Sequence, residues 1–166
     1  MSATSGHAGT AGPPTPDHAG VPVPPPLLYA AGFAVALALE RRWPLPRPPA
    51  RPARRVGAAL LVVGAVLPAS GATLFHRRDT SVLPVRPTTA LVTSGPYRLT
   101  RNPMYVGFAL GHAGLALLRR STWAVLMLGP VLAAVDRMVI AREERYLERA
   151  FGDEYRRYAR RVRRWL

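Results

Sequence analysis

The sequence predicts an all-α integral membrane protein, in which a bundle of about four transmembrane helices precedes a cytoplasmic C-terminal amphipathic helix. Two observations predict this fold class: four long runs lack any charged residue, and the arginines gather in the joints between the runs. A helix needs about 20 apolar residues to cross a bilayer core. Val56–Phe75 reaches that length, and Ser121–Val135 does so if it continues past the charged pair Asp136-Arg137 to Ala141. The other two runs, Leu27–Leu39 and Asn102–Leu118, are shorter.

The charge composition narrows the class of partner. All 23 basic residues are arginine, the formal net charge is +14, and there is no cysteine. The lack of cysteine excludes disulfides, thiol nucleophiles and Cys-ligated metals. A strongly basic chain can bind nucleic acid or anionic lipid. Here the arginines border apolar runs and form no basic face with aromatic platforms, so we expect a lipid bilayer as the partner and no nucleic acid.

The chain divides into three segments. Residues 1–26 contain seven prolines and no Lys or Arg, which predicts a disordered N-terminal tail without the basic start of a signal peptide. Residues 27–75 hold two transmembrane helices joined by the Pro/Arg-rich linker Glu40–Arg55. Residues 76–166 hold a connecting loop, a helical hairpin and a C-terminal helix, and form the predicted catalytic region.

The distribution of arginine predicts the orientation. With both termini in the cytoplasm, fourteen arginines lie inside and eight outside, which is the bias of the positive-inside rule. The arginine-only, Ala- and Pro-rich composition suggests a bacterial source. We therefore expect a multi-pass protein of a bacterial inner or plasma membrane, with its C-terminus in the cytoplasm.

The first motif is LVTSGPYRLTRNPMYVG, at Leu91–Gly107. Ser94-Gly95-Pro96 predicts a turn in which glycine takes a positive φ. Asn102 is a favoured N-cap and Pro103 a favoured first helical residue, so a helix should begin there. The free amides of a helix start attract a carboxylate or a phosphate. The flanking Arg and Tyr side chains fit such a site, or equally an interfacial belt; they are Tyr97, Arg98, Arg101 and Tyr105.

The second motif lies within Asp136–Leu166. Asp136-Arg137 falls within or near the bilayer, where ionisable groups are usually paired or functional. The adjacent acidic pair Glu143-Glu144 fits a salt-bridged helix end as well as a site. Gly152 predicts a helix stop, and Asp153 a new N-cap. The amphipathic helix after it should present one aromatic and apolar side, formed by Tyr155, Tyr158, Val162 and Trp165.

Together, the two motifs resemble the isoprenylcysteine carboxyl methyltransferase family, which is related to the membrane phospholipid N-methyltransferases. The family pattern is similar to L-V-T-x-G-x-Y-x-x-x-R-H-P-x-Y-x-G, followed by a helical hairpin, an E-E pair and F-G-x-E-Y-x-x-Y. This chain reads LVTSGPYRLTRNPMYVG and later EERYLERAFGDEYRRY, and the resemblance covers about residues 86–166. It implies S-adenosyl-L-methionine as the cofactor and methyl transfer to a hydrophobic, lipid-like acceptor, through carboxylate O-methylation.

The resemblance also implies roles for individual residues. The implied cofactor-binding residues are Leu91, Val92, Gly95, Tyr97, Asn102, Pro103, Met104, Tyr105 and Glu143. The implied catalytic residues are Arg101, Asn102 and Glu144. Candidate substrate-binding residues are Arg137, Arg142 and His112. His112 lies in mid-span, where it either faces the acceptor or bonds to a neighbouring helix carbonyl. No metal site is expected, because the four histidines lack ligand spacing.

Two positions depart from the family pattern. Asn102 stands where the family has histidine, and an amide cannot titrate near neutral pH, so we expect no proton transfer there. Val139 stands where the eukaryotic enzymes have an arginine that helps to hold the prenylcysteine carboxylate. This argues against a prenylcysteine substrate unless Arg137 or Arg142 takes that place.

Three other functions stay open at this stage. They are a phospholipid-type N-methyltransferase, a membrane reductase of related bundle fold with a nicotinamide cofactor, and a non-catalytic membrane protein that holds anionic headgroups.

Overall fold

The computed structural model describes residues 20–76 and 90–166, and the regular structure over these residues is entirely helical. Residues 1–19 of the expected N-terminal tail and residues 77–89 of the connecting loop lie outside the described part. The α-helices are α1 (Pro25–Arg42), α2 (Ala50–His76), α3 (Pro103–Leu118), α4 (Thr122–Val135) and α5 (Ala141–Arg161). A 3₁₀ turn, η1 (Gly95–Arg98), precedes α3, and a π-helical turn, η2 (Asp136–Ile140), joins α4 to α5.

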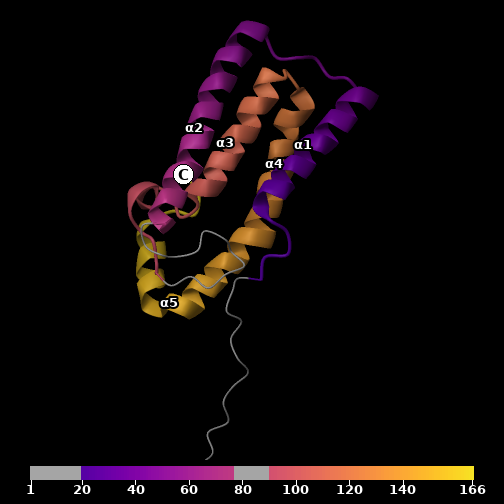
Figure 1. Ribbon diagram of the computed structural model, residues 1–166. Coiled ribbons are helices and arrows are strands. Elements are labelled where there is room, and N and C mark those ends of the chain that lie inside the picture. The colour runs from indigo at the N-terminus through magenta and orange to yellow at the C-terminus, as the bar shows by residue number, and fades with distance from the viewer. Residues whose placement is uncertain (1–19, 77–89) are drawn as a thin grey trace, which may run out of the picture.

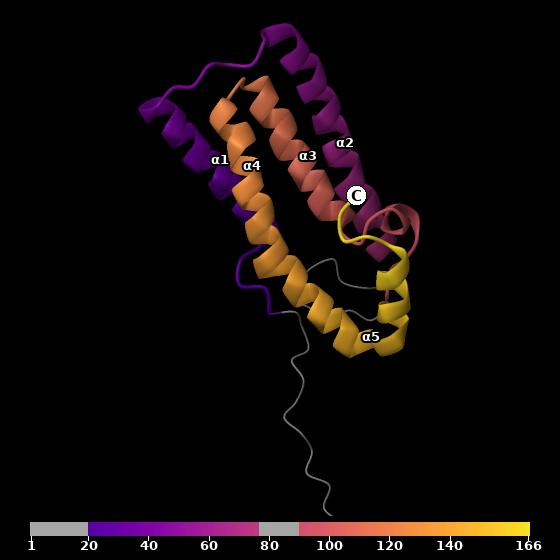
Figure 2. The ribbon, with the colours of Figure 1, turned by 180° about the vertical axis from the view of Figure 1, so that it is seen from behind.

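The first four helices run side by side in the order α2, α3, α4, α1 (Figures 1 and 2). α2 packs along α3 and α1 along α4, and the α3–α4 hairpin joins the two pairs. Each uncharged run of the sequence accordingly lies within one helix, apart from the N-cap residues Asn102 and Ser121 that precede α3 and α4. α5 bends across one end of the bundle and carries the C-terminus back towards the first turn of α3 (Figure 2).

Two helical stretches are long and apolar enough to cross a membrane. They are Ala50–Leu74 and Thr122–Phe151, with mean hydropathies of 1.8 and 1.9, whereas α3 is apolar but shorter. The outer face of α2 exposes Val62, Val63 and Val66. A row of exposed β-branched apolar side chains is unusual on a water-facing surface and is typical of a surface that meets an apolar phase.

The linker between the first two helices is shorter than the sequence predicted. α1 continues to Arg42 and α2 begins at Ala50, so the proline-rich linker is confined to residues 43–49. It lies against the α3–α4 turn, because Arg120 Nε donates to the Pro48 carbonyl at 2.8 Å and Trp123 Nε1 donates to the Trp43 carbonyl at 2.6 Å. These two arginine-bearing joints therefore lie at the same end of the bundle.

Glycines bring the backbones of α2 and α3 into contact. A Cβ placed on Gly64 would lie 2.6 Å from the Gly111 nitrogen and 2.8 Å from the Gly107 carbonyl oxygen. A Cβ on Gly57 would lie 2.8 Å from the Gly114 oxygen. Small residues at such positions let membrane helices approach closely. The α2–α3 pair thus depends on glycines spaced seven residues apart on α2, at 57, 64 and 71.

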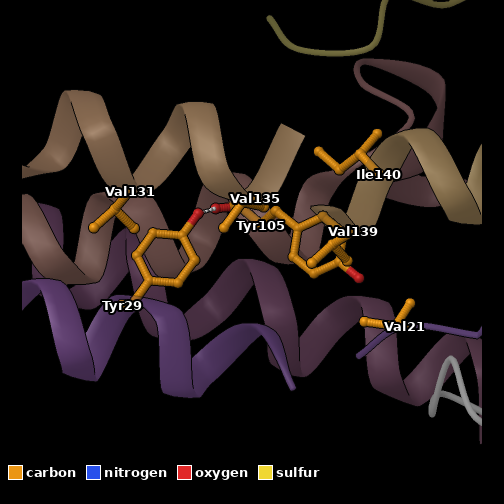
Figure 3. Close-up of a cluster of buried hydrophobic side chains, with 7 residues drawn as sticks. All are labelled: Val21, Tyr29, Tyr105, Val131, Val135, Val139 and Ile140. Atoms are coloured by element: carbon orange, nitrogen blue, oxygen red, sulfur yellow. Dashed lines mark hydrogen bonds between the residues drawn. The ribbon is translucent and has the colours of Figure 1, made fainter. Parts of the chain in front are cut away.

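A buried apolar cluster closes the opposite end of the bundle. It joins α1, α3, α4 and η2 through Val21, Tyr29, Tyr105, Val131, Val135, Val139 and Ile140 (Figure 3). Val21 is only 9% exposed, although the sequence analysis assigned it to a disordered tail. The described part of that tail, from Gly20 onwards, leads into α1 and packs against the cluster because its valine side chain is apolar.

The C-terminal region differs in part from the prediction. Gly152 has φ +50° and breaks the helix, as expected from a glycine stop. The helix that follows ends at Arg161, and Val162 is extended (φ −120°, ψ 131°). Trp165 therefore does not continue the apolar face of a helix. It folds back against the buried cluster instead.

Candidate functional site

The two sequence motifs meet at the end of the bundle where α3 begins. η1 and the first turn of α3 lie there beside α5 and the C-terminal residues (Figures 1 and 2). Residues far apart in the chain are joined there by direct hydrogen bonds. The juxtaposition depends on the α3–α4 hairpin, which returns the chain to the level at which it started.

The centre of the site is a hydrogen bond between Tyr105 and Glu143. Tyr105, in the first turn of α3, donates its hydroxyl to Glu143 Oε1, in the first turn of α5, at 2.6 Å. The Tyr29 hydroxyl of α1 donates to the Tyr105 carbonyl at 3.1 Å (Figure 3). A phenol on a carboxylate is a charge-assisted bond, stronger than one between neutral groups. It fixes the orientation of the Glu143 carboxylate.

Glu144 takes part in a different network. Arg101 Nη2 lies 3.1 Å from Glu144 Oε1, and each side chain is only 16% exposed. Arg164 binds the same carboxylate, with Nε 3.1 Å from Oε1 and Nη2 on Oε2. Of the two alternatives for the acidic pair, the salt-bridged helix end holds only in part: Glu144 is in ion pairs, but it is mostly buried and its partners are Arg101 and Arg164. Glu144 is bound by two arginines from distant segments, and Glu143 by a tyrosine.

Asn102 occupies the predicted N-cap position but does not cap with its side chain. α3 begins at Pro103, as predicted, with no hydrogen bond from the Asn102 side chain to the helix. Instead, Asn102 Nδ2 donates to the Arg164 carbonyl at 2.9 Å, and the backbone amide of Asn102 donates to Thr100 Oγ1 at 3.1 Å. The first-turn amides of α3 are thus left without a side-chain cap.

Three tyrosines take part in the contacts between α5 and the segment that runs from η1 to Arg101. Tyr158 donates its hydroxyl to the Tyr97 carbonyl at 2.7 Å, and Arg101 Nη1 donates to the Tyr155 hydroxyl at 3.4 Å. Burial raises the pKa of Tyr155 to about 12, with the Glu144 charge as a smaller cause. Burial also raises the pKa of Tyr97 well above its usual value. Both phenols are therefore neutral at physiological pH and act as hydrogen-bonding groups, not as bases.

The remaining candidates from the first motif border this region. Leu91 and Val92 are buried at 9% and 5% exposure. Gly95 adopts φ +60°, the positive value predicted for the turn. Pro103 is buried and Met104 half-buried. Met104 lies against α2, where a Cβ on Gly71 would meet it at 3.2 Å.

The candidate substrate residues are not gathered in the same way. Arg137 is exposed, and Arg142 Nη1 donates to the Gly20 carbonyl at 3.1 Å. Val139, at the position of the family arginine, is fully buried in the apolar cluster. His112 is 6% exposed and its Nε2 lies 2.9 Å from the Ala124 carbonyl oxygen. His112 therefore bonds to a carbonyl of the neighbouring helix α4, which is one of the two alternatives that its position in the sequence allowed.

An apolar groove of about 340 Å³ opens between α1, α2 and α3. His112 lines it, together with Tyr29, Phe33, Leu61, Phe108 and Gly111. The groove exists because α2 approaches α3 through glycines, while α1 packs on α4 instead. Since Tyr29 also binds the Tyr105 carbonyl, one wall of the groove adjoins the Tyr105–Glu143 pair.

Sequence reasoning missed Tyr29 and the C-terminal contacts of the site. Asp136 was recognised as unusual, because it is an ionisable residue in a segment that was expected to lie within or near the bilayer. Arg164 carried no signal, since it is one of nine arginines after residue 141. Among the described residues, no group of three or more His, Cys, Asp or Glu side chains is placed to hold a metal ion.

Comparison with known proteins agrees with the motif resemblance. The phospholipid methyltransferase family model matches residues 53–154. The cobalt-zinc-cadmium resistance protein of Cupriavidus metallidurans is 42% identical over 77 residues, 46% of this chain and 35% of that protein. The nickel-cobalt-cadmium resistance protein of Alcaligenes xylosoxydans xylosoxydans is 36% identical over 107 residues, 64% of this chain and 49% of that protein.

A third relative is named for its reaction. The protein-S-isoprenylcysteine O-methyltransferase of Schizosaccharomyces pombe is 38% identical over 72 residues, 43% of this chain and 30% of that protein. The chain thus spans about a third to a half of these three curated relatives. No solved structure matches it significantly. Because the family model covers residues 53–154, most of both motifs included, the chain belongs to the phospholipid methyltransferase family.

Proposed function

We propose that the chain is an integral-membrane methyltransferase that uses S-adenosylmethionine and acts on a lipid-like or other hydrophobic acceptor. The observation that carries this proposal is the Tyr105–Glu143 hydrogen bond, because it joins the two family motifs into one site. Membership of the phospholipid methyltransferase family supports methyl transfer as the reaction.

The side chains at the site suit S-adenosylmethionine. The methionine part of this cofactor carries an ammonium and a carboxylate, and its ribose carries hydroxyls. Glu143, held by Tyr105, offers a carboxylate oxygen to the ammonium or to the hydroxyls. The uncapped first turn of α3 and the nearby Arg101 offer donors to the carboxylate. Leu91 and Val92 would add apolar contacts. The cofactor supplies an electrophilic methyl group on a sulfonium.

Asn102 and the phenols of the site favour proximity over proton transfer. Asn102 does not titrate, and the neutral phenols of Tyr97 and Tyr155 are poor bases. A carboxylate acceptor requires no general base, so we propose carboxylate O-methylation. An amine acceptor would have to arrive uncharged. The family description favours such phospholipid-type N-methylation as the second candidate. Burial of the site would strip water from either nucleophile.

The groove beside α3 is the proposed place of the acceptor's apolar part. Its lining is aliphatic and aromatic except for His112 and the Tyr29 hydroxyl. A hydrocarbon chain is thus favoured over a polar ligand. Tyr29 links the groove to the Tyr105–Glu143 pair, which would bring the reactive end of the acceptor close to the cofactor.

The proposal includes four transmembrane helices with the site at the cytoplasmic end. The bundle of α1–α4 and the exposed valines of α2 support it. The excess of arginine in the C-terminal region supports a cytoplasmic C-terminus. In this orientation α5, with arginine along much of its length, would lie at the anionic surface of the inner leaflet.

The test is a labelling assay with the full chain. Membranes that contain the protein are incubated with S-adenosylmethionine labelled in its methyl group, and the lipid fraction is then treated with base. We expect protein-dependent label that base releases, since a methyl ester is base-labile. Base-stable label would indicate N-methylation instead. Absence of label together with binding of a nicotinamide cofactor in a competition assay would refute the methyltransferase proposal in favour of a reductase.

Gly111→Leu tests the groove separately from the cofactor site. A Cβ at Gly111 meets nothing within 4 Å, so leucine fits without a backbone clash and fills the groove. We expect product formation to fall by at least about tenfold, roughly 1.4 kcal/mol. Calorimetric binding of S-adenosylmethionine should stay unchanged.

Gly129→Leu is the matched control for this substitution. Its Cβ also meets open space, but Gly129 is exposed on α4 and does not line the groove. Equal product formation by the two variants would show that the acceptor does not use the groove.

A further inference from the structure

The last five residues, Val162–Leu166, form a strap that returns across the start of α3. The Arg101 amide donates to the Arg163 carbonyl at 2.9 Å. Thr100 Oγ1 and Asn102 Nδ2 both donate to the Arg164 carbonyl at 2.9 Å. Three consecutive residues before α3 are thus bonded to two consecutive carbonyls of the strap.

The side chains of the strap reach in the opposite direction, towards η2 and α5. Arg164 Nη1 lies 3.2 Å from Asp136 Oδ2, while Arg164 Nε and Nη2 bind Glu144. Trp165 Nε1 donates to Asp136 Oδ1 at 3.0 Å. One guanidinium therefore binds two carboxylates from different elements. Only arginine offers enough fixed donors for this arrangement.

The π-helical turn helps to bring the two carboxylates to one guanidinium. Asp136 and Glu144 are eight residues apart, and a straight α-helix, at about 100° per residue, would set them roughly 80° apart around its axis. The wider turn of η2 reduces that rotation. Val139 and Ile140, both fully buried, hold η2 in the apolar cluster.

The charges of this network balance. Arg101 and Arg164 face Asp136 and Glu144, and Arg101 and Glu144 are mostly buried. With Glu144 bound to two arginines, its neighbour Glu143 is directed to Tyr105. The strap therefore contacts the Thr100–Asn102 segment and Glu144 directly, and Glu144 is the chain neighbour of Glu143.

We propose that the C-terminal strap is a positioning element of the active site, with Arg164 as the positioning residue that holds Arg101, Asn102 and Glu144 in place. The role assigned to these three residues rests on the proposed function. The position of the strap itself does not, because it follows from the contacts alone.

The experiment measures two quantities on the full chain in detergent micelles. Amide hydrogen exchange at Arg101 reports the strap, because that amide is bonded to the Arg163 carbonyl, and the α3 amides are the internal reference. Calorimetric titration with S-adenosylmethionine reports the site. For Arg164→Ala we expect exchange at Arg101 to be faster, and cofactor affinity lower, each by about tenfold or more, with the α3 amides unchanged. Arg164→Lys keeps the positive charge but loses the planar guanidinium with its several donors. Its exchange rate and its affinity should lie between those of the wild type and Arg164→Ala.

The control is Arg161→Ala, which removes an exposed arginine at the end of α5 and should match the wild type in both measurements. The proposal would be overturned if the Arg101 amide of Arg164→Ala exchanged at the wild-type rate. It would also be overturned if that amide exchanged faster while the cofactor affinity stayed unchanged. If the alanine variant does not fold, Trp165→Phe removes only the indole N–H bonded to Asp136. We expect this variant to exchange the Arg101 amide about threefold faster and to bind the cofactor about threefold more weakly. No change in either quantity would overturn the proposal.

The two proposals fail in different ways. If the wild-type protein does not bind S-adenosylmethionine, the proposed function fails, while the exchange measurement still tests whether the strap holds residues 100–102. If the wild type binds the cofactor and Arg164→Ala behaves like Arg161→Ala, the proposed function stands and the strap proposal fails.

Discussion

Replacing Glu143 with glutamine is expected to weaken binding of S-adenosylmethionine by about 10- to 150-fold, roughly 1.5–3 kcal/mol for a hydrogen bond to a charged group. Glutamine has nearly the same shape and can still accept the Tyr105 hydroxyl, so the fold should be retained. It lacks the negative charge that would pair with the cofactor ammonium. Isothermal titration calorimetry on the purified protein measures the loss.

Glu154→Gln is the matched control for this substitution. Glu154 is an exposed glutamate on the same helix, and it forms no ion pair with the described residues. We expect its affinity to equal that of the wild type. Equal affinities for Glu143→Gln and the wild type would show that Glu143 does not contact the cofactor.

Tyr105→Phe probes the other partner of the central hydrogen bond. It removes the donor that holds Glu143 Oε1 at 2.6 Å, so the carboxylate loses its fixed orientation. We expect a smaller loss of affinity than for Glu143→Gln, about tenfold. The double variant should lose less than the sum of the two, because both substitutions break one interaction. Strict additivity would indicate that the two side chains act independently.

Replacing Gly64 with leucine is expected to have the largest effect on stability. The new Cβ would lie 2.6 Å from the Gly111 nitrogen and 2.8 Å from the Gly107 oxygen. Both are backbone atoms of α3, so no side-chain rotation relieves the clash and the helices must separate. Overpacking typically costs about 1–3 kcal/mol, and separation of α2 from α3 would add to it. Thermal unfolding followed by circular dichroism in detergent measures the shift.

Ala59→Leu is the control, since Ala59 is exposed on the same helix. Leucine there lengthens an apolar side chain on the outer surface and should leave the unfolding temperature nearly unchanged. If Gly64→Leu and Ala59→Leu unfold at the same temperature, the α2 and α3 backbones do not approach each other closely at Gly64.

The positions of the helices could be predicted because each depends on neighbouring residues. Uncharged runs bounded by arginine mark helices, and the Asn102-Pro103 pair marks the start of α3. Gly152 marks a break because only a residue without Cβ adopts its φ of +50° easily. Where the environment mattered, the prediction failed: the linker proved shorter, and Trp165 left the helix to reach Asp136.

The sequence by itself determined the all-helical fold class, the two motifs and the family, since these depend on composition and on the order of residues along the chain. It also placed Tyr105 and Glu143 in one site, through the resemblance. Only the tertiary structure decided which groups touch. Asn102 was expected to cap α3, yet its side chain binds the Arg164 carbonyl. Arg164 was one arginine among many, yet it joins Asp136 to Glu144. Such contacts form between residues 20 or more apart in sequence, and their partners are set by how the helices pack.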